Sequence, residues 1–170
     1  RKQYRKPVID DECCYEGNVP QGWGNITGQE LVKRFWDGFI RGGYVGHGET
    51  YLHPDNVLWW SKGGVLHGTS PARIAFLRKI IEASPGPLEP KNIGVPCAGH
   101  METYYLAYLG PNQSARKRLT LPEDHEYRIE IIDTWEMEIS TVDRTYTGKF
   151  DIDLPGKPFT ALRITRKEEA

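Results

Sequence analysis

Residues 6–17 read Lys6-Pro7-Val8-Ile9-Asp10-Asp11-Glu12-Cys13-Cys14-Tyr15-Glu16-Gly17, and this stretch decides the fold. Pro7 has no N–H to donate to a ladder and can only begin a strand, whereas Val8 and Ile9 are β-branched residues that strands prefer. The pattern predicts a short buried strand with Glu12 near its carboxyl end. In barrels and open sheets of parallel strands, reactive groups stand at the carboxyl ends. Glu12 is therefore a candidate for chemistry.

Composition excludes several classes of function. The chain has 170 residues, a net charge of -1 and 26% charged residues, which is typical of a soluble globular protein. We expect no nucleic-acid partner because there is no basic excess, and no membrane partner because no apolar run approaches about 18 residues. The three cysteines favour a reducing compartment such as the cytoplasm, with secretion as the open alternative. No Cys-x-x-Cys motif is present, and we predict neither a metal nor a cofactor.

The next segment predicts a helix followed at once by a strand. Residues 27–30, Thr-Gly-Gln-Glu, form a capping box, and apolar residues then recur at intervals of four up to Gly42-Gly43. Residues 44–51 return as a strand, so the strand–helix–strand unit must be parallel. Along that strand His47, Glu49 and Tyr51 alternate and point to one side, where we expect them to face Glu12.

Beyond this unit the sequence predicts a second helix and then a change of period. Ser70-Pro71 is a helix start, and Pro-rich residues 85–94 read as a linker. Six short alternating runs follow between turn signals, which indicates an antiparallel sandwich. We therefore predict an α/β domain at residues 1–84, a linker at 85–94 and an all-β antiparallel sandwich at 95–170.

The motifs resemble a known group of enzymes. Lys-Pro-Val-Ile-x-x-Glu at residues 6–12 resembles the seventh strand of the (β/α)8 glycoside hydrolases of the cellulase-like clan, whose glutamate at this place is the nucleophile. Residues 13–17 and Gly-His-Gly-Glu-Thr-Tyr at 46–51 are similar to the apiosidase-like barrels, often followed by a small β-sandwich. The resemblance implies that residues 1–84 are the last two βα units of a TIM-type barrel. A whole barrel takes about 250 residues, so the expected partner is the remainder of the barrel, encoded upstream.

The resemblance implies a retaining glycoside hydrolase that cleaves plant-type poly- or oligosaccharides, with Glu12 as its nucleophile. The acid/base of the family lies on the fourth strand, which this chain lacks. A retaining pair needs carboxyl groups roughly 5–5.5 Å apart, so we expect the chain alone to be inactive. Glu49 or Glu16 as the missing partner is the open alternative. A structural salt bridge is the other interpretation of Glu12.

Aromatic and polar residues in the predicted mouth loops would bind the carbohydrate, because sugar rings stack on aromatic faces while their hydroxyls need fixed polar partners. The predicted substrate-binding residues are Tyr15, Glu16, Trp23, His47, Glu49, Tyr51, Trp59 and Trp60. Each aromatic could instead pack between loop and barrel. A metal bound by histidines and a thiol nucleophile at Cys13-Cys14 are weaker alternatives, since neither matches a known spacing.

A function from another class remains open for the sandwich. It could bind carbohydrate, with Tyr104, Tyr105 and Tyr108 as the place to look for an exposed aromatic row, or it could merely stabilise the barrel. We favour the stabilising role because the linker is short.

Overall fold

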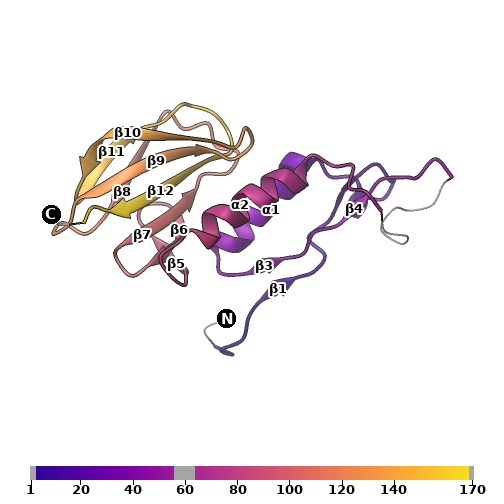
Figure 1. Ribbon diagram of the computed structural model, residues 1–170, viewed down its shortest axis with the longest axis horizontal. Helices are drawn as coiled ribbons and strands as arrows, with labels where there is room; N and C mark the ends of the chain where they lie inside the picture. The colour runs from indigo at the N-terminus through magenta and orange to yellow at the C-terminus, as the bar shows by residue number, and fades with distance from the viewer. Residues whose placement is uncertain (1–2, 56–63, 169–170) are drawn as a thin grey trace. The chain divides into compact units, whose positions relative to one another are not determined.

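The computed structural model describes residues 3–55 and 64–168, which divide into two compact units (Figure 1). The first unit comprises Arg1–Phe39 and Gly43–Arg78, and the second comprises Ile40–Gly42 and Lys79–Ala170. Most of the regular structure is strand, and there are two α-helices in the described part of the chain. Neither helix is long and apolar enough to cross a membrane.

The first unit contains the predicted parallel strand–helix–strand arrangement. Strand β1 (Ile9–Asp10) pairs in parallel with β3 (Tyr44–Val45), and helix α1 (Gly28–Ile40) lies between them in sequence. A second parallel pair joins β2 (Glu16–Gly17) to β4 (Glu49–Thr50), with Glu16 opposite Glu49. The unit also holds a short 3-10 helix, Gly22–Gly24, and the start of α2 (Ser70–Glu82). Two glutamates distant in sequence therefore stand side by side.

Helix α1 forms as its sequence pattern predicts. The hydroxyl of Thr27 accepts a hydrogen bond from the Glu30 N–H at 3.2 Å, and the side chains of Leu31, Val32 and Trp36 are buried. The other half of the capping box is replaced, because the Glu30 carboxylate accepts from Arg34 Nε at 2.8 Å, an (i, i+4) pair. Arg34 also donates to the Cys13 carbonyl, so this pair ties α1 to the segment after Glu12.

The predicted burial of the first strand was wrong for this structure. Val8 and Ile9 are 50% and 59% exposed, and Tyr44 on the neighbouring strand is 64% exposed. Within the described residues β1 pairs with a single strand, so nothing covers its apolar side chains. The sequence predicted the β-branched strand correctly but not its surroundings.

The second unit is built from strands packed in two layers. In chain order these are β5 (Glu89–Asn92), β6 (Pro96–His100), β7 (Tyr104–Tyr108), β8 (Arg116–Thr120), β9 (Tyr127–Asp133), β10 (Glu138–Tyr146), β11 (Lys149–Asp153) and β12 (Thr160–Arg166). Six of them form one antiparallel sheet in the order β10-β9-β12-β7-β6-β5, and β11 pairs with β8. The apolar core includes Leu119 and Ile152 from the smaller sheet and Ile129, Leu162 and Ile164 from the larger one. This packing is consistent with the predicted β-sandwich.

The sheet differs from the prediction at its two edges. Strand β5 lies inside the predicted linker, and β6 was not predicted because Pro96 and Gly99 are poor strand formers. Pro96 nevertheless occupies the first position of its strand, where a missing N–H is tolerated. At the other edge β10 runs nine residues with a register shift between Thr141 and Thr145, and Trp135 lies in the turn before it.

Candidate active site

A hollow of about 600 Å³ lies in the first unit, and it gathers most of the predicted site. Its lining residues are Glu12, Cys14, Tyr15, Trp23, His47, Gly48 and Glu49. Five of these were predicted as catalytic or substrate-binding residues from the sequence. The parallel pairing of β1 with β3 and of β2 with β4 is what brings residues 12–23 beside residues 47–49.

Glu12 lies in the turn that follows β1 and its side chain is exposed. Its negative charge acts on the neighbouring Tyr15: burial raises the pKa of the Tyr15 hydroxyl, and the Glu12 carboxylate raises it further. Tyr15 donates to the Asp11 carbonyl at 3.3 Å, which holds its ring against the turn. Glu12 is thus an accessible carboxylate at the edge of a partly aromatic hollow.

The aromatic wall is held in place by main-chain hydrogen bonds. The Tyr15 N–H donates to the Trp23 carbonyl at 2.7 Å, and the two rings meet edge to face with centroids 6.3 Å apart. Thr50 Oγ1 donates to the Gly24 carbonyl at 2.6 Å and anchors the end of the same loop. Trp23 therefore stands on a fastened loop, with part of its ring exposed.

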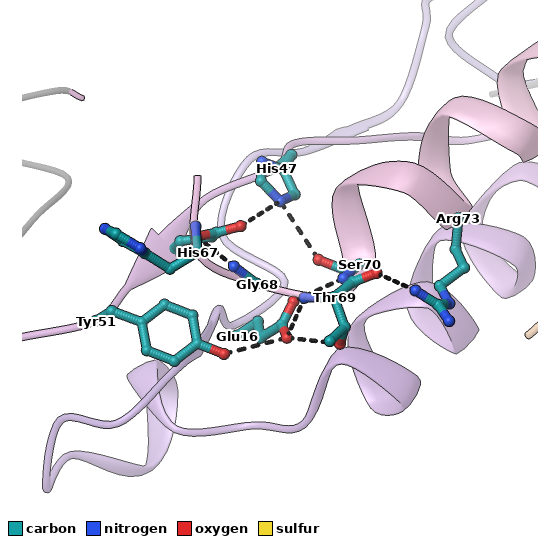
Figure 2. Close-up of polar contacts among 9 residues, drawn as sticks. Glu16, His47, Tyr51, His67, Gly68, Thr69, Ser70 and Arg73 are labelled. Carbon is teal, nitrogen blue, oxygen red and sulfur yellow. Dashed lines mark hydrogen bonds and ion pairs between the residues drawn. The ribbon is translucent and has the colours of Figure 1, made fainter. Parts of the chain in front are cut away.

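Glu16 has a different environment from Glu12, although the two are only four positions apart in the sequence. It is 3% exposed, and its Oε1 accepts from the Tyr51 hydroxyl at 3.1 Å, the Thr69 N–H at 2.8 Å and the Thr69 hydroxyl at 2.9 Å (Figure 2). Its Oε2 accepts from the Ser70 N–H at 2.9 Å. A carboxylate at a helix N-terminus also interacts favourably with the helix dipole. These bonds favour a structural role for Glu16.

The titration of this cluster follows from the same contacts. Burial alone would raise the pKa of Glu16, but hydrogen bonds from Ser70 and Thr69 outweigh it, and the pKa is lowered. Burial raises the pKa of Tyr51 to about 12, and the nearby Glu16 carboxylate raises it as well. Tyr51, predicted to bind substrate, donates its hydroxyl to Glu16 instead of facing the hollow's lining residues.

Glu49 and His47 form the inner wall of the hollow. Glu49 is 0% exposed, and its Oε2 accepts from the backbone N–H groups of His67 and Gly68 at 2.8 and 3.0 Å. His47 Nε2 lies 3.9 Å from Glu49 Oε1 and 3.5 Å from Ser70 Oγ, as Figure 2 shows. Its ring also packs against Phe35 of α1, with centroids 6.4 Å apart.

Residues 67–70 are the part of this region that the sequence analysis missed. Glu16 and Glu49 together accept four consecutive backbone N–H groups of this segment, which leads into α2. A side chain at Gly68 would collide with both carboxylates, since a Cβ there would lie 2.4 Å from Glu16 Oε2 and 2.6 Å from Glu49 Oε1. The Ser70-Pro71 helix start was a usable signal, because helix N-termini attract carboxylates.

Three further sequence-based hypotheses concerned the tryptophan pair, a cysteine nucleophile and a metal site. Trp59 and Trp60 lie outside the described residues. Burial raises the pKa of the Cys13 thiol and the Asp10 carboxylate raises it further, which disfavours a thiolate nucleophile. Among residues 3–55 and 64–168, no group of three or more metal-ligating side chains could hold a metal ion.

The sandwich lacks the predicted aromatic platform. Tyr104, Tyr105 and Tyr108 are all buried, so they offer no exposed row on which a sugar could stack. Tyr105 belongs to the apolar core and meets Tyr127 with ring centroids 6.1 Å apart. This burial removes the feature that would have favoured a carbohydrate-binding role for the sandwich.

The chain matches one protein-family profile and several solved structures. The profile of DUF5605, described as a domain of unknown function, matches residues 94–165. A candidate glycoside hydrolase from Bacteroides vulgatus ATCC 8482 is 33% identical over 98% of the chain, with a TM-score of 0.86, and 37% of that structure is covered. No match to the chain was found among curated proteins.

Two further solved structures share the fold. One is a glycoside hydrolase, 12% identical over 97% of the chain and 43% of its own length, with a TM-score of 0.73. The other is a family 5 glycoside hydrolase from Bacteroides vulgatus ATCC 8482, 14% identical over 94% of the chain and 41% of its own length, with a TM-score of 0.72. The chain spans less than half the length of each structure and is related to glycoside hydrolases.

Proposed function

We propose that this chain is the C-terminal part of a retaining glycoside hydrolase of the apiosidase-like type, in which Glu12 is the nucleophile. The observation that carries the proposal is the likeness to a candidate glycoside hydrolase over 98% of the chain. It is supported by the hollow, which places an exposed carboxylate beside aromatic side chains and a histidine. Glu12 would attack the anomeric carbon through an oxocarbenium-like transition state and form a glycosyl-enzyme.

Glu12 is a better candidate for the nucleophile than its buried neighbour. A carboxylate whose oxygens already accept four hydrogen bonds, as in Glu16, must give up those bonds before it can attack. Glu12 is exposed at the edge of the hollow and accepts no such set of hydrogen bonds from the residues that the structure describes. The acid/base would come from the upstream part of the protein, within roughly 5–5.5 Å of Glu12. The 170-residue chain alone is then inactive.

We also propose that the first unit completes a (β/α)8 barrel with upstream strands. The two parallel strand pairs and the helix between them fit the last two βα units of such a barrel. Val8, Ile9 and Tyr44 are exposed apolar residues on β1 and β3 or beside them, and neighbouring barrel elements would cover them. The second unit, with its own core, would be the stabilising sandwich.

The carbohydrate would bind in the hollow, with Tyr15 and Trp23 against the apolar face of a sugar ring. His47 would supply a polar contact on the inner wall, whereas Glu49 is fully buried. Glu16 and Tyr51 would act indirectly, because their hydrogen bonds fix the segment that leads into α2. This assignment keeps three of the eight predicted binding residues, Tyr15, Trp23 and His47, in direct contact with sugar.

The decisive experiment is Glu12→Gln in the full-length protein, assayed against activated aryl glycosides of several sugars. Turnover should be abolished while the melting temperature stays nearly unchanged, because Glu12 is exposed. Asp11→Asn is the matched control: it removes an exposed carboxylate from the adjacent position and should retain turnover. A Glu12→Gln protein that keeps most of its rate would exclude Glu12 as the nucleophile.

A further inference from the structure

Glu49 is a fully buried carboxylate in which one oxygen accepts hydrogen bonds and the other accepts none from the described residues. The backbone N–H groups of His67 and Gly68 hold Oε2 at 2.8 and 3.0 Å, so the carboxylate cannot rotate freely. Oε1 is buried and has no hydrogen-bond partner among the described residues. A buried charged acceptor without a partner is destabilising. His47 Nε2 lies 3.9 Å from Glu49 Oε1.

His47 lies beside this carboxylate at the wall of the hollow. Its side chain is 24% exposed, whereas that of Glu49 is 0% exposed. Nε2 is 3.5 Å from Ser70 Oγ, and Phe35 packs against the ring. A small movement of the ring would bring Nε2 within hydrogen-bond distance of Glu49 Oε1.

We propose that Glu49 is a positioning residue that fixes His47 with its proton on Nε2, so that Nδ1 accepts a hydrogen bond from a sugar hydroxyl in the hollow. This inference rests on the proposed glycosidase function and assigns its hydroxyl recognition. An ionised carboxylate only accepts hydrogen bonds, so the ring nitrogen that faces it must carry the hydrogen. In neutral imidazole the other nitrogen is then an acceptor, and it requires a donor such as a hydroxyl.

The tautomer can be measured without any enzyme assay. The full-length protein is labelled with ¹⁵N-histidine, and His47 is identified by the signals that His47→Ala removes. At about pH 8, where imidazole is ordinarily neutral, the His47 ring should carry its proton on Nε2. Glu49→Gln keeps the shape and an oxygen for the His67 and Gly68 N–H groups but turns an amide NH₂ toward Nε2, so the proton should move to Nδ1.

Kinetics then test the link to the substrate. Glu49→Gln should lower kcat/KM by about 10- to 100-fold, by analogy with the loss seen when the hydrogen-bond partner of a metal-ligating histidine is removed. The double variant with His47→Ala should be no worse than His47→Ala alone, because Glu49 acts through His47. Glu136→Gln is the matched control, an exposed glutamate in a turn of the sandwich, and should leave kcat/KM unchanged.

The outcomes separate this inference from the proposed function. A His47 ring protonated on Nδ1 in the wild type, or losses that add in the double variant, would overturn the positioning role while turnover of aryl glycosides still supports a glycosidase. A wild-type protein without turnover of any aryl glycoside would instead count against the glycosidase, and with it the hydroxyl contact. An Nε2 proton that moves in Glu49→Gln, together with non-additive losses, supports the inference.

Discussion

Replacing Glu16 by glutamine should destabilise the protein, because it reverses one hydrogen-bonding group at the start of α2. One side-chain oxygen would still accept from Tyr51 and Thr69, but an NH₂ group would face the Ser70 N–H, which Oε2 now accepts at 2.9 Å. A buried donor without an acceptor costs about 1–3 kcal/mol, and loss of a negative charge near a helix N-terminus costs about 0.3–1 kcal/mol. We expect the free energy of unfolding to fall by about 2–3 kcal/mol.

The measurement is thermal and urea unfolding of the intact protein, followed by circular dichroism. For a cooperative unit of 150–250 residues, a loss of this size lowers Tm by about 4–12 °C. Glu12→Gln is the control, because the same change at an exposed position should cost less than about 0.5 kcal/mol. A loss below about 0.5 kcal/mol for Glu16→Gln as well would refute the structural role that its four hydrogen bonds imply.

The same variant predicts a pH dependence with a definite sign. The pKa of Glu16 is lowered from an ordinary value of 4.5, so between its folded and unfolded pKa values the unfolded chain binds more protons. The contribution of Glu16 is therefore present above pH 4.5 and is lost as the pH falls through 4.5 toward the lower folded value. The difference in urea midpoint between wild type and Glu16→Gln should shrink below pH 4.5, and a difference that persists unchanged would contradict this assignment.

Two matched pairs of substitutions test packing in the two units by the same unfolding assay. Gly68→Ala should cost about 1–3 kcal/mol, because a Cβ there meets two clamped carboxylates, whereas Gly22→Ala meets nothing within 4 Å and should cost little. Tyr127→Phe should cost about 1 kcal/mol by removing its bond to the Glu102 carbonyl, while Tyr104→Phe should be neutral or stabilising, since that hydroxyl has no hydrogen-bond partner among the described residues. Equal costs within either pair would contradict the packing described.

Local sequence patterns predicted the helices and strands in which buried side chains recur at the spacing typical of that element. Helix α1 shows apolar residues at intervals of four, and β9 alternates between Tyr127 and Ile129 facing the core and polar neighbours. The patterns failed at β6, where Pro96 and Gly99 mask a strand that two flanking partners stabilise. Strand β10 lies at a sheet edge and is exposed along most of its length, so its period carried little signal.

The sequence predicted which backbone segments meet at the site, but not which side chains pair there. The predicted strand at residues 44–51 is two short strands, β3 and β4, with His47 between them. Their parallel pairing still brings His47 and Glu49 to the wall of a hollow that Glu12 also lines. Tyr51 shares the predicted alternation but turns to Glu16, a contact between residues 35 positions apart. Glu16 in turn is held by the backbone N–H groups of Thr69 and Ser70. No local sequence pattern predicts where that segment lies in the folded protein.

The choice between Glu12 and Glu16 as the free carboxylate shows what the structure adds to the motif. Both glutamates follow β1 in the sequence, Glu12 in the turn and Glu16 at the start of β2. Burial and hydrogen bonding separate them, because a nucleophile must have a lone pair free to attack and Glu16 has committed its oxygens to four donors. Glu12 is exposed at the edge of the hollow. If Glu16 fixes the α2 segment that holds Glu49 and His47, the buried acid supports the site where the exposed acid would react.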